Sequence, residues 1–449
     1  MDIDQSEYWP DVCELLESLL NAVPFEVMLN EHQITLLAVI NNAPQRVILS
    51  IVNNYFKTIT DPQSMYLFRT SGLAVTVALT RRVSGPICYE ALAKFLAQFV
   101  DVKEVRIELE NQLKNQKDAE RRFRVYEVLR CAMALPTFSN YELVQPIMDS
   151  LVAELSEDDL LSCITALEVL SEIARSGAAS NSSYLNQIGL LDKTYQMFMR
   201  SKDNPDGGLI HSACIRFFGH LSVNSPNALE KFSLFTSEIF DMIYHFDQVD
   251  ATRRQLAFDT LAVMSTSSSA KQFLSIPSCV YNMRKAMNHF GVAIGIAPDE
   301  LRTRHIDSLK TMLTGCQNSN DSNILLEWFK ELGEPFPTMV YNFLRKPFED
   351  LKISCLELLI AMVKLHTWAF NQFARVNGFL DYLLDRKSEC SPHICMLKFD
   401  LVCAAIDAAS TNHTIDEPTI EKLQKYKQEG VYGKSAARTA DFVMDWQNN

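Results

Sequence analysis

The feature of this 449-residue sequence that most constrains its fold is a recurring apolar segment with helical spacing. Within each segment apolar residues follow one another at intervals of three or four, as they do along one face of an α-helix. Aligned on a central leucine, the segments recur every 40 to 51 residues, at Leu129, Leu170, Leu221, Leu261, Leu309, Leu359 and Leu401. A period of this length indicates stacked helical units that share their apolar faces.

The residues between these segments predict a three-helix unit. A polar turn leads to a short helix, then to Gly or Pro, and then to a further apolar helix, as in residues 181–198, 267–287 and 366–387. The 14 Gly and 16 Pro are fewer than the turns of an all-β protein require. We therefore predict an all-α armadillo/HEAT-like repeat solenoid that forms a curved superhelix, with a non-repeating helical protein as the alternative.

Three parts are predicted along the chain. Residues 1–118 are helical by pattern but fit the period poorly, which is expected of divergent N-terminal repeats or a cap with a polar outer face. Residues 119–425 carry the armadillo/HEAT-like repeats, and residues 426–449 form a C-terminal helix and tail. Ser156 and Asp159 resemble a capping box that opens a helix at Leu160.

The charge of the chain bears on its partners and location. Its net charge of −13 disfavours binding to nucleic acid or to anionic membrane surfaces, which both require Lys and Arg. The acidic N-terminal residues do not resemble a signal or transit peptide, and no stretch of ~18 apolar residues predicts a membrane span. We expect a protein of the cytoplasm that could also enter the nucleus, with cysteines packed as small apolar residues.

Three short motifs resemble known catalytic, nucleotide-binding or metal-binding motifs. Residues 430–434 (GVYGK) have two residues between the glycines where a phosphate-binding loop has four. Ser268 and Lys271 match the S-x-x-K of serine acyl-enzymes, but the partner motifs are missing and a polar turn that opens a helix explains them better. Cys390, His393 and Cys395 are one ligand short of a closed zinc site, so Cys395 is expected in a helix core and His393 in solvent.

No constellation in the sequence supports catalysis, so we expect no enzyme activity, no catalytic residue, no metal and no cofactor. The densest basic cluster is Arg121, Arg122, Arg124 and Arg130. We interpret it as an ion-pair face, with a docking site for an acidic peptide as the alternative. The four Trp lack Asn four residues later, which runs against import adaptors that hold basic peptides with Trp-x-x-x-Asn pairs.

Six segments resemble helices of one known family, the proteasome non-ATPase regulatory subunit 5 family. They cover about Ala119 to Gly433 and occur in the family's order. The segments are RFRVYEVL (122–129), CIRFFGHLSV (214–223), FDTLAVM (258–264), ELRTRHIDSL (300–309), NGFLDYLLDR (377–386) and YKQEGVY (426–432).

The resemblance implies a solenoid that acts as an assembly chaperone of the 26S proteasome. Members of the family bind the C-terminal domain of one base ATPase, regulatory subunit 7, within a precursor module of the base, and leave before the mature particle is complete. An armadillo/HEAT-type scaffold or adaptor for another complex is the alternative, since fold alone does not fix function.

The partner is expected to contact the third helix of each unit, because third helices usually line the inner face of armadillo arrays. Side chains outside the apolar stripes of these helices are the candidate contacts. They are Lys193, Gln196, Asn282, Arg284, Lys285, Asp381 and Arg386.

Overall fold

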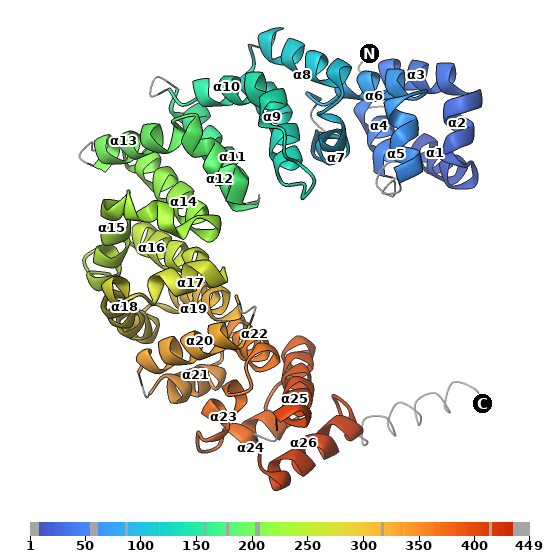
Figure 1. Ribbon diagram of the computed structural model, residues 1–449. Helices are drawn as coiled ribbons and strands as arrows, with labels where there is room; N and C mark the ends of the chain where they lie inside the picture. The colour runs from blue at the N-terminus through green and yellow to red at the C-terminus, as the bar shows by residue number, and fades with distance from the viewer. Residues whose placement is uncertain are drawn as a thin grey trace, which may run out of the picture. The chain divides into compact units, whose positions relative to one another are not determined.

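The computed structural model describes residues 9–53, 62–85, 89–115, 117–156, 159–176, 179–202, 207–315, 318–333, 335–412 and 415–433. Throughout these residues the regular secondary structure is helical, as Figure 1 shows. The prediction of an all-α protein is therefore confirmed. Helix contacts divide the chain into two units, with the boundary between Phe217 and Phe218 in the helix α14 (Gly208–Asn224).

The N-terminal unit contains two rows of packed helices. α3 packs on α6, α6 on α8 and α8 on α10, while α7 packs on α9 and α9 on α11. The bounds are α1 Trp9–Ala22, α2 Phe25–Glu31, α3 Gln33–Asn42, α4 Gln45–Ile51, α5 Pro62–Arg69, α6 Leu73–Thr80, α7 Tyr89–Leu96, η3 Ala97–Phe99, α8 Lys103–Asn115, α9 Ala119–Met133, η4 Tyr141–Val144, α10 Gln145–Ala153, α11 Leu160–Ser176, α12 Ala179–Gln187 and α13 Leu190–Lys202.

The C-terminal unit is organised around α16, α19, α22 and α25, which we call the ladder helices because each packs on the next. Beside them α15 packs on α16, α18 on α19 and α21 on α22, which makes a second layer (Figure 1). The bounds are η6 Pro226–Glu230, α15 Ser233–Tyr244, α16 Ala251–Met264, α17 Ser268–Leu274, α18 Pro277–Ile296, α19 Asp299–Thr314, α20 Ser319–Glu331, α21 Phe336–Leu344, α22 Glu349–Leu365, α23 Ala369–Ala374, α24 Phe379–Leu384, α25 Pro392–Asn412 and α26 Glu417–Glu429.

The predicted repeat is confirmed by the burial of its central leucines. The seven aligned leucines lie in α9, α11, α14, α16, α19, α22 and α25, and each is at most 1% exposed. The predicted pairs of a short helix and a third helix are also present, as α12 with α13, α17 with α18 and α23 with α24. A long helix, a short helix and a third helix thus repeat through both units.

Side-chain caps explain where several of these helices begin. Asp118, Asp250, Ser267 and Asp416 each accept a hydrogen bond from a backbone N–H of the first turn that follows. α11 begins at Leu160 as predicted, but the cap is Asp159, which accepts from the Ser162 N–H at 3.1 Å. Of the two residues of the predicted capping box, Asp159 directly precedes Leu160 and caps the helix.

The predicted three-part division stays a prediction. α9 begins at Ala119, and α26 runs across residue 425 without a break. Residues 434–449 of the predicted tail lie outside the described residues.

Candidate protein-binding surfaces

The seven predicted contact residues are distributed over three helices and one turn. In the N-terminal unit, Gln196 on α13 is exposed, while the Lys193 Nζ donates to the Val152 carbonyl at 3.1 Å. That hydrogen bond ties α13 to the end of α10, so Lys193 has a structural role whatever else it contacts.

Asn282, Arg284 and Lys285 lie on α18 in the C-terminal unit. The Tyr244 hydroxyl donates to the Asn282 carbonyl at 3.0 Å, and the Lys285 Nζ lies 3.9 Å from the centre of the Tyr244 ring. The Arg284 Nε lies 3.7 Å from Glu331 Oε1, and the two side chains are 55% and 40% exposed. A loose, exposed pair of this kind adds little stability, so Arg284 remains available to a partner.

Asp381 and Arg386 lie in and after α24. Asp381 is exposed. The Arg386 guanidinium donates to the Tyr426 and Gly430 carbonyls at 2.9 and 3.1 Å and covers the Tyr426 ring at 3.8 Å. This side chain fastens the end of α26 to the unit, which is a role in the fold rather than in recognition.

An exposed apolar stripe on α18 was missed by the sequence reasoning. Tyr281 and Ile296 are 72% and 65% exposed, and Val292 between them is half exposed. Their spacing of 11 and 4 residues puts all three on the side of α18 that also carries Lys285. We call Tyr281, Arg284, Lys285, Val292 and Ile296 the α18 face. In the sequence this stripe is visible as a second set of apolar residues at helical spacing on α18. Such a set cannot be told apart from a buried stripe by sequence alone.

A polar groove of about 330 Å³ runs between the ladder helices α16 and α19. Its floor is a hydrogen-bond network, in which Ser308 Oγ and Gln255 Nε2 both donate to Asp259 Oδ1. The His305 Nδ1 donates to Gln255 Oε1 at 2.9 Å. The groove is lined by Gln255, Asp259, Ala262, Val263, Arg304, Asp307, Ser308 and Thr311.

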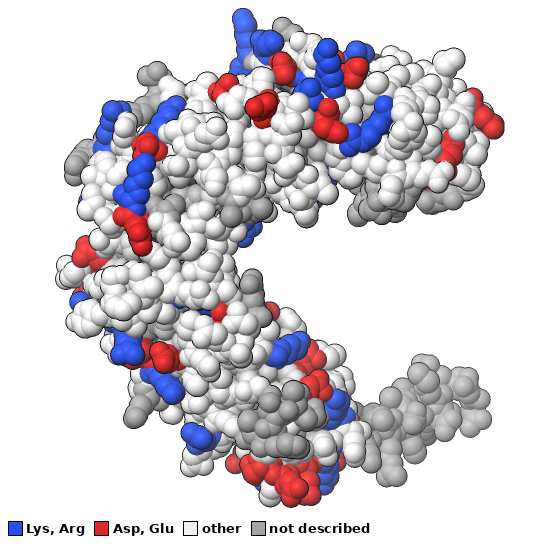
Figure 2. Space-filling model, viewed as in Figure 1, with Lys and Arg blue, Asp and Glu red and all other residues white. Residues whose placement is uncertain are grey.

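The polar network continues to the next ladder helix. The Lys310 Nζ on α19 donates to Glu357 Oε2 on α22 at 2.7 Å. Burial raises the pKa of Asp307, while the neighbouring Lys310 charge opposes that shift. Within the face shown in Figure 2, Lys and Arg side chains lie among Asp and Glu side chains.

The buried His305 side chain should make the C-terminal unit less stable in acid. It is fully buried, and burial, aided by the Arg254 charge, lowers its pKa to about 4. In the unfolded chain a histidine has a pKa near 6.5, so it takes up a proton at a higher pH than the buried His305 does. The free energy of unfolding therefore falls as the pH falls from 6.5 towards 4, by about 2 kcal/mol at pH 5. Urea unfolding at pH 7.5 and pH 5.0 should show a smaller acid loss for His305→Gln than for the wild type. The exposed His393→Gln is the control, and equal losses in all three proteins would contradict the assignment.

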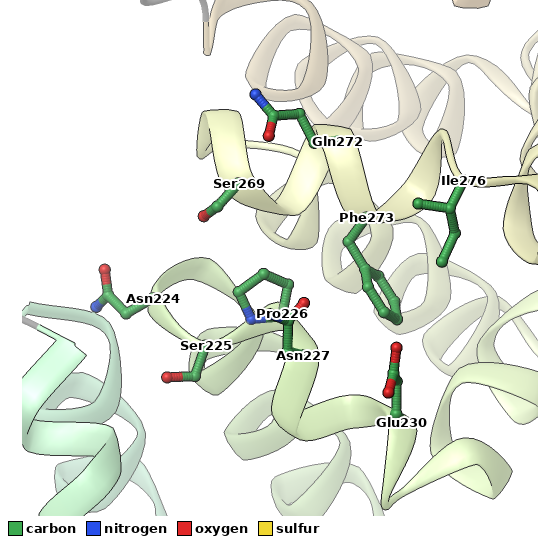
Figure 3. A pocket seen from close by; sticks show the side chains of 9 residues that line it. All are labelled: Asn224, Ser225, Pro226, Asn227, Glu230, Ser269, Gln272, Phe273 and Ile276. Atoms are coloured by element: carbon green, nitrogen blue, oxygen red, sulfur yellow. The ribbon is translucent and has the colours of Figure 1, made fainter.

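A second concavity, the η6–α17 pocket, has a volume of about 550 Å³ (Figure 3). It lies between η6 and α17, which are the short helices of two successive repeats within the C-terminal unit. Its floor is apolar, with Phe273 only 9% exposed, and its rim carries amide and hydroxyl side chains. The lining residues are Asn224, Ser225, Pro226, Asn227, Glu230, Ser269, Gln272, Phe273 and Ile276.

The short motifs have structural roles where they can be seen. Ser268 Oγ donates to the Asp321 carboxylate, and the Lys271 Nζ donates to the Thr266 carbonyl at 3.2 Å. Cys395 is buried and His393 exposed, as expected. Lys434 of the glycine motif lies outside the described residues.

The arginine cluster forms the predicted ion-pair face. The partners are Asp118 for Arg121, Glu154 for Arg122, Glu120 for Arg124 and Glu127 for Arg130. In the described chain, no three His, Cys, Asp or Glu side chains gather as a metal site would require. None of the described helices combines the length and apolarity of a membrane span.

Comparisons with known proteins agree with this architecture. The chain is 24% identical over 317 residues to the human 26S proteasome non-ATPase regulatory subunit 5, a match that covers 69% of this chain and 61% of the relative. It is 23% identical over 352 residues to the Drosophila melanogaster protein of the same name, covering 78% and 67%. Thus the match spans less than two thirds of the human relative's length.

Among solved structures, a crystal structure of importin beta superposes with a TM-score of 0.54 at 12% identity, covering 100% of this chain and 55% of importin beta. This likeness concerns the fold alone and confirms the armadillo/HEAT-like repeat architecture. A family model described as "Proteasome non-ATPase 26S subunit" matches residues 4–443, which includes all but the first three of residues 1–118. That match confirms the resemblance drawn from six helical segments and shows that the chain belongs to the proteasome non-ATPase 26S subunit family.

Proposed function

We propose that this chain is a non-enzymatic chaperone for assembly of the base of the 26S proteasome regulatory particle. It binds the C-terminal domain of the base ATPase regulatory subunit 7, within a precursor module of the base, and is released before the proteasome is mature. It acts in the cytoplasm. The observation that carries the proposal is the family match over residues 4–443, together with the proteasome subunit names of the relatives.

The geometry is compatible with this role. Stacked helices offer long surfaces to a folded partner, as repeat proteins generally do. The ladder helices bear a groove with both charge signs, and α18 bears exposed apolar and basic side chains. Release requires an interface of moderate strength, and a polar rim around a small apolar centre is suited to that.

A binding panel tests the proposal. The full chain is presented in turn with the isolated C-terminal domain of each base ATPase, and we expect selective binding to that of regulatory subunit 7. Affinity purification from cells should recover base ATPases without the complete proteolytic core. Recovery of an unrelated complex, with no binding in the panel, would favour a scaffold or adaptor of another kind.

Charge reversal on the α18 face should weaken this binding. Arg284→Glu with Lys285→Glu replaces two exposed cations by anions, and we expect about a tenfold or greater loss of affinity for the ATPase domain. Lys422→Glu with Lys425→Glu, on the exposed side of α26, is the matched control and should bind normally. Thermal melting checks that loss of the Lys285 contact with Tyr244 has not unfolded the unit. Unchanged binding by the α18 variant would remove this face from the interface.

A further inference from the structure

The η6–α17 pocket lies at the first of three successive helix junctions in the C-terminal unit. Between α17 and α20, Ser268 hydrogen-bonds to the Asp321 carboxylate. Between α20 and the turn before α23, Ser322 hydrogen-bonds to both His366 and Trp368, at 3.0 and 3.2 Å. Those hydrogen bonds join the helices at the two later junctions, and the junction between η6 and α17 holds the pocket of about 550 Å³. This volume lies within the ~300–1,000 Å³ of ligand pockets.

The uncharged polar side chains that line the pocket can hydrogen-bond to a peptide backbone. Asn227 on η6 and Gln272 on α17 are exposed at the rim of the pocket (Figure 3). An amide side chain both donates and accepts hydrogen bonds, so two of them can pair with the N–H and C=O groups of an extended segment. Buried Pro226 and Phe273 supply an apolar floor between them.

The negative charge of the pocket lining favours a positively charged ligand group. Glu230 carries the charge among the nine lining residues, and its carboxylate points towards the Phe273 ring (Figure 3). The adjacent Lys231 places its Nζ 5.5 Å from the centre of the Phe232 ring. A carboxylate beside an aromatic ring favours an ammonium or guanidinium group, by charge and by the cation–π interaction.

We propose that the η6–α17 pocket binds a lysine or arginine side chain from an extended segment of a protein partner. The cation lies between the Glu230 carboxylate and the Phe273 ring, and Asn227 and Gln272 hydrogen-bond to the segment's backbone. The inference goes beyond the proposed function, because it concerns the kind of peptide side chain that the pocket binds and not the identity of the partner.

Short peptides test the pocket directly. The probes are acetyl-Gly-Ser-Xaa-Ser-Gly-amide with Arg, Lys, norleucine or Glu at Xaa, titrated into the full chain and followed by saturation-transfer difference NMR. We expect the Arg and Lys peptides to bind at least about tenfold more tightly than the other two, as a charge-assisted contact would give. Glu230→Gln should remove this preference, and Ser269→Tyr, which fills the pocket from its rim, should abolish binding.

The matched control is Glu327→Gln, an exposed carboxylate on α20 that should leave every affinity unchanged. Circular dichroism checks that each variant is folded. Equal binding of the Arg and norleucine peptides, a Glu230→Gln variant that keeps the preference, or no binding of any peptide would each overturn the proposal. None of these outcomes depends on whether the ATPase domain binds, so failure here is separable from failure of the proposed function.

Discussion

Replacing Lys271 by Met should destabilise the C-terminal unit by about 3–5 kcal/mol, the usual consequence of removing one partner of a buried ion pair. The side chains of Lys271 and Asp321 are both 0% exposed, and the Nζ lies 3.8 Å from Asp321 Oδ2. Without the ammonium group, the Asp321 carboxylate keeps its hydrogen bond from Ser268 but has lost the neighbouring positive charge. Urea unfolding followed by tryptophan fluorescence measures the loss, since Trp328 is buried on the same helix as Asp321.

A double-mutant cycle separates the charge from the packing. Asp321→Asn neutralises the carboxylate, so Lys271→Met with Asp321→Asn should be more stable than Lys271→Met alone, with a coupling of about 0.5–3 kcal/mol. Lys330→Met, at an exposed position of α20, should stay within about 0.5 kcal/mol of the wild type. A cycle with no coupling would show that the pair does not hold α17 to α20.

The same pair shows where sequence reasoning works and where it stops. The pattern at Ser268 and Lys271 predicted a polar turn that opens a helix, and α17 does begin at Ser268, capped by Ser267. Helix starts depend on residues within one turn, so they can be predicted locally. The partner Asp321 lies 50 residues further along the chain, and no local rule joins the two.

The repeat itself was predictable for a related reason. A buried helix must be apolar along its length, and a stack of such helices must repeat that pattern at the length of one unit. Leu261, Leu309 and Leu359 therefore align in the sequence, and each is buried in a ladder helix.

The surfaces were harder to predict, because exposure depends on which neighbours a helix finds. Val292 and Ile296 are apolar and helically spaced, as core residues are, yet Val292 is half exposed and Ile296 largely exposed. Arg386 was predicted as a contact for a partner, but its guanidinium hydrogen-bonds to carbonyls at the end of α26. Binding by the seven predicted contact residues stays a prediction.

The second large effect concerns the crossing of α18 and α20. Gly291 is buried on α18, and a Cβ at this position would lie 2.2 Å from the Leu332 carbonyl oxygen at the end of α20. That atom belongs to the backbone, so the two helices must separate before a methyl group fits. Gly291→Ala should therefore destabilise the unit by about 3 kcal/mol, the upper part of the range for overpacking, although Ala is the better helix former.

Gly295, one turn later on the same helix, is the matched control. A Cβ there would lie 3.1 Å from the Met339 sulfur, which is on a flexible side chain that can move aside. Gly295→Ala should therefore be neutral or more stable by up to about 1 kcal/mol, because Ala loses less backbone entropy than Gly in a helix. Thermal melting should show a fall of roughly 6–12 °C for Gly291→Ala and none for Gly295→Ala. Equal melting temperatures for the two variants would mean that α18 and α20 do not cross as closely as Gly291 requires.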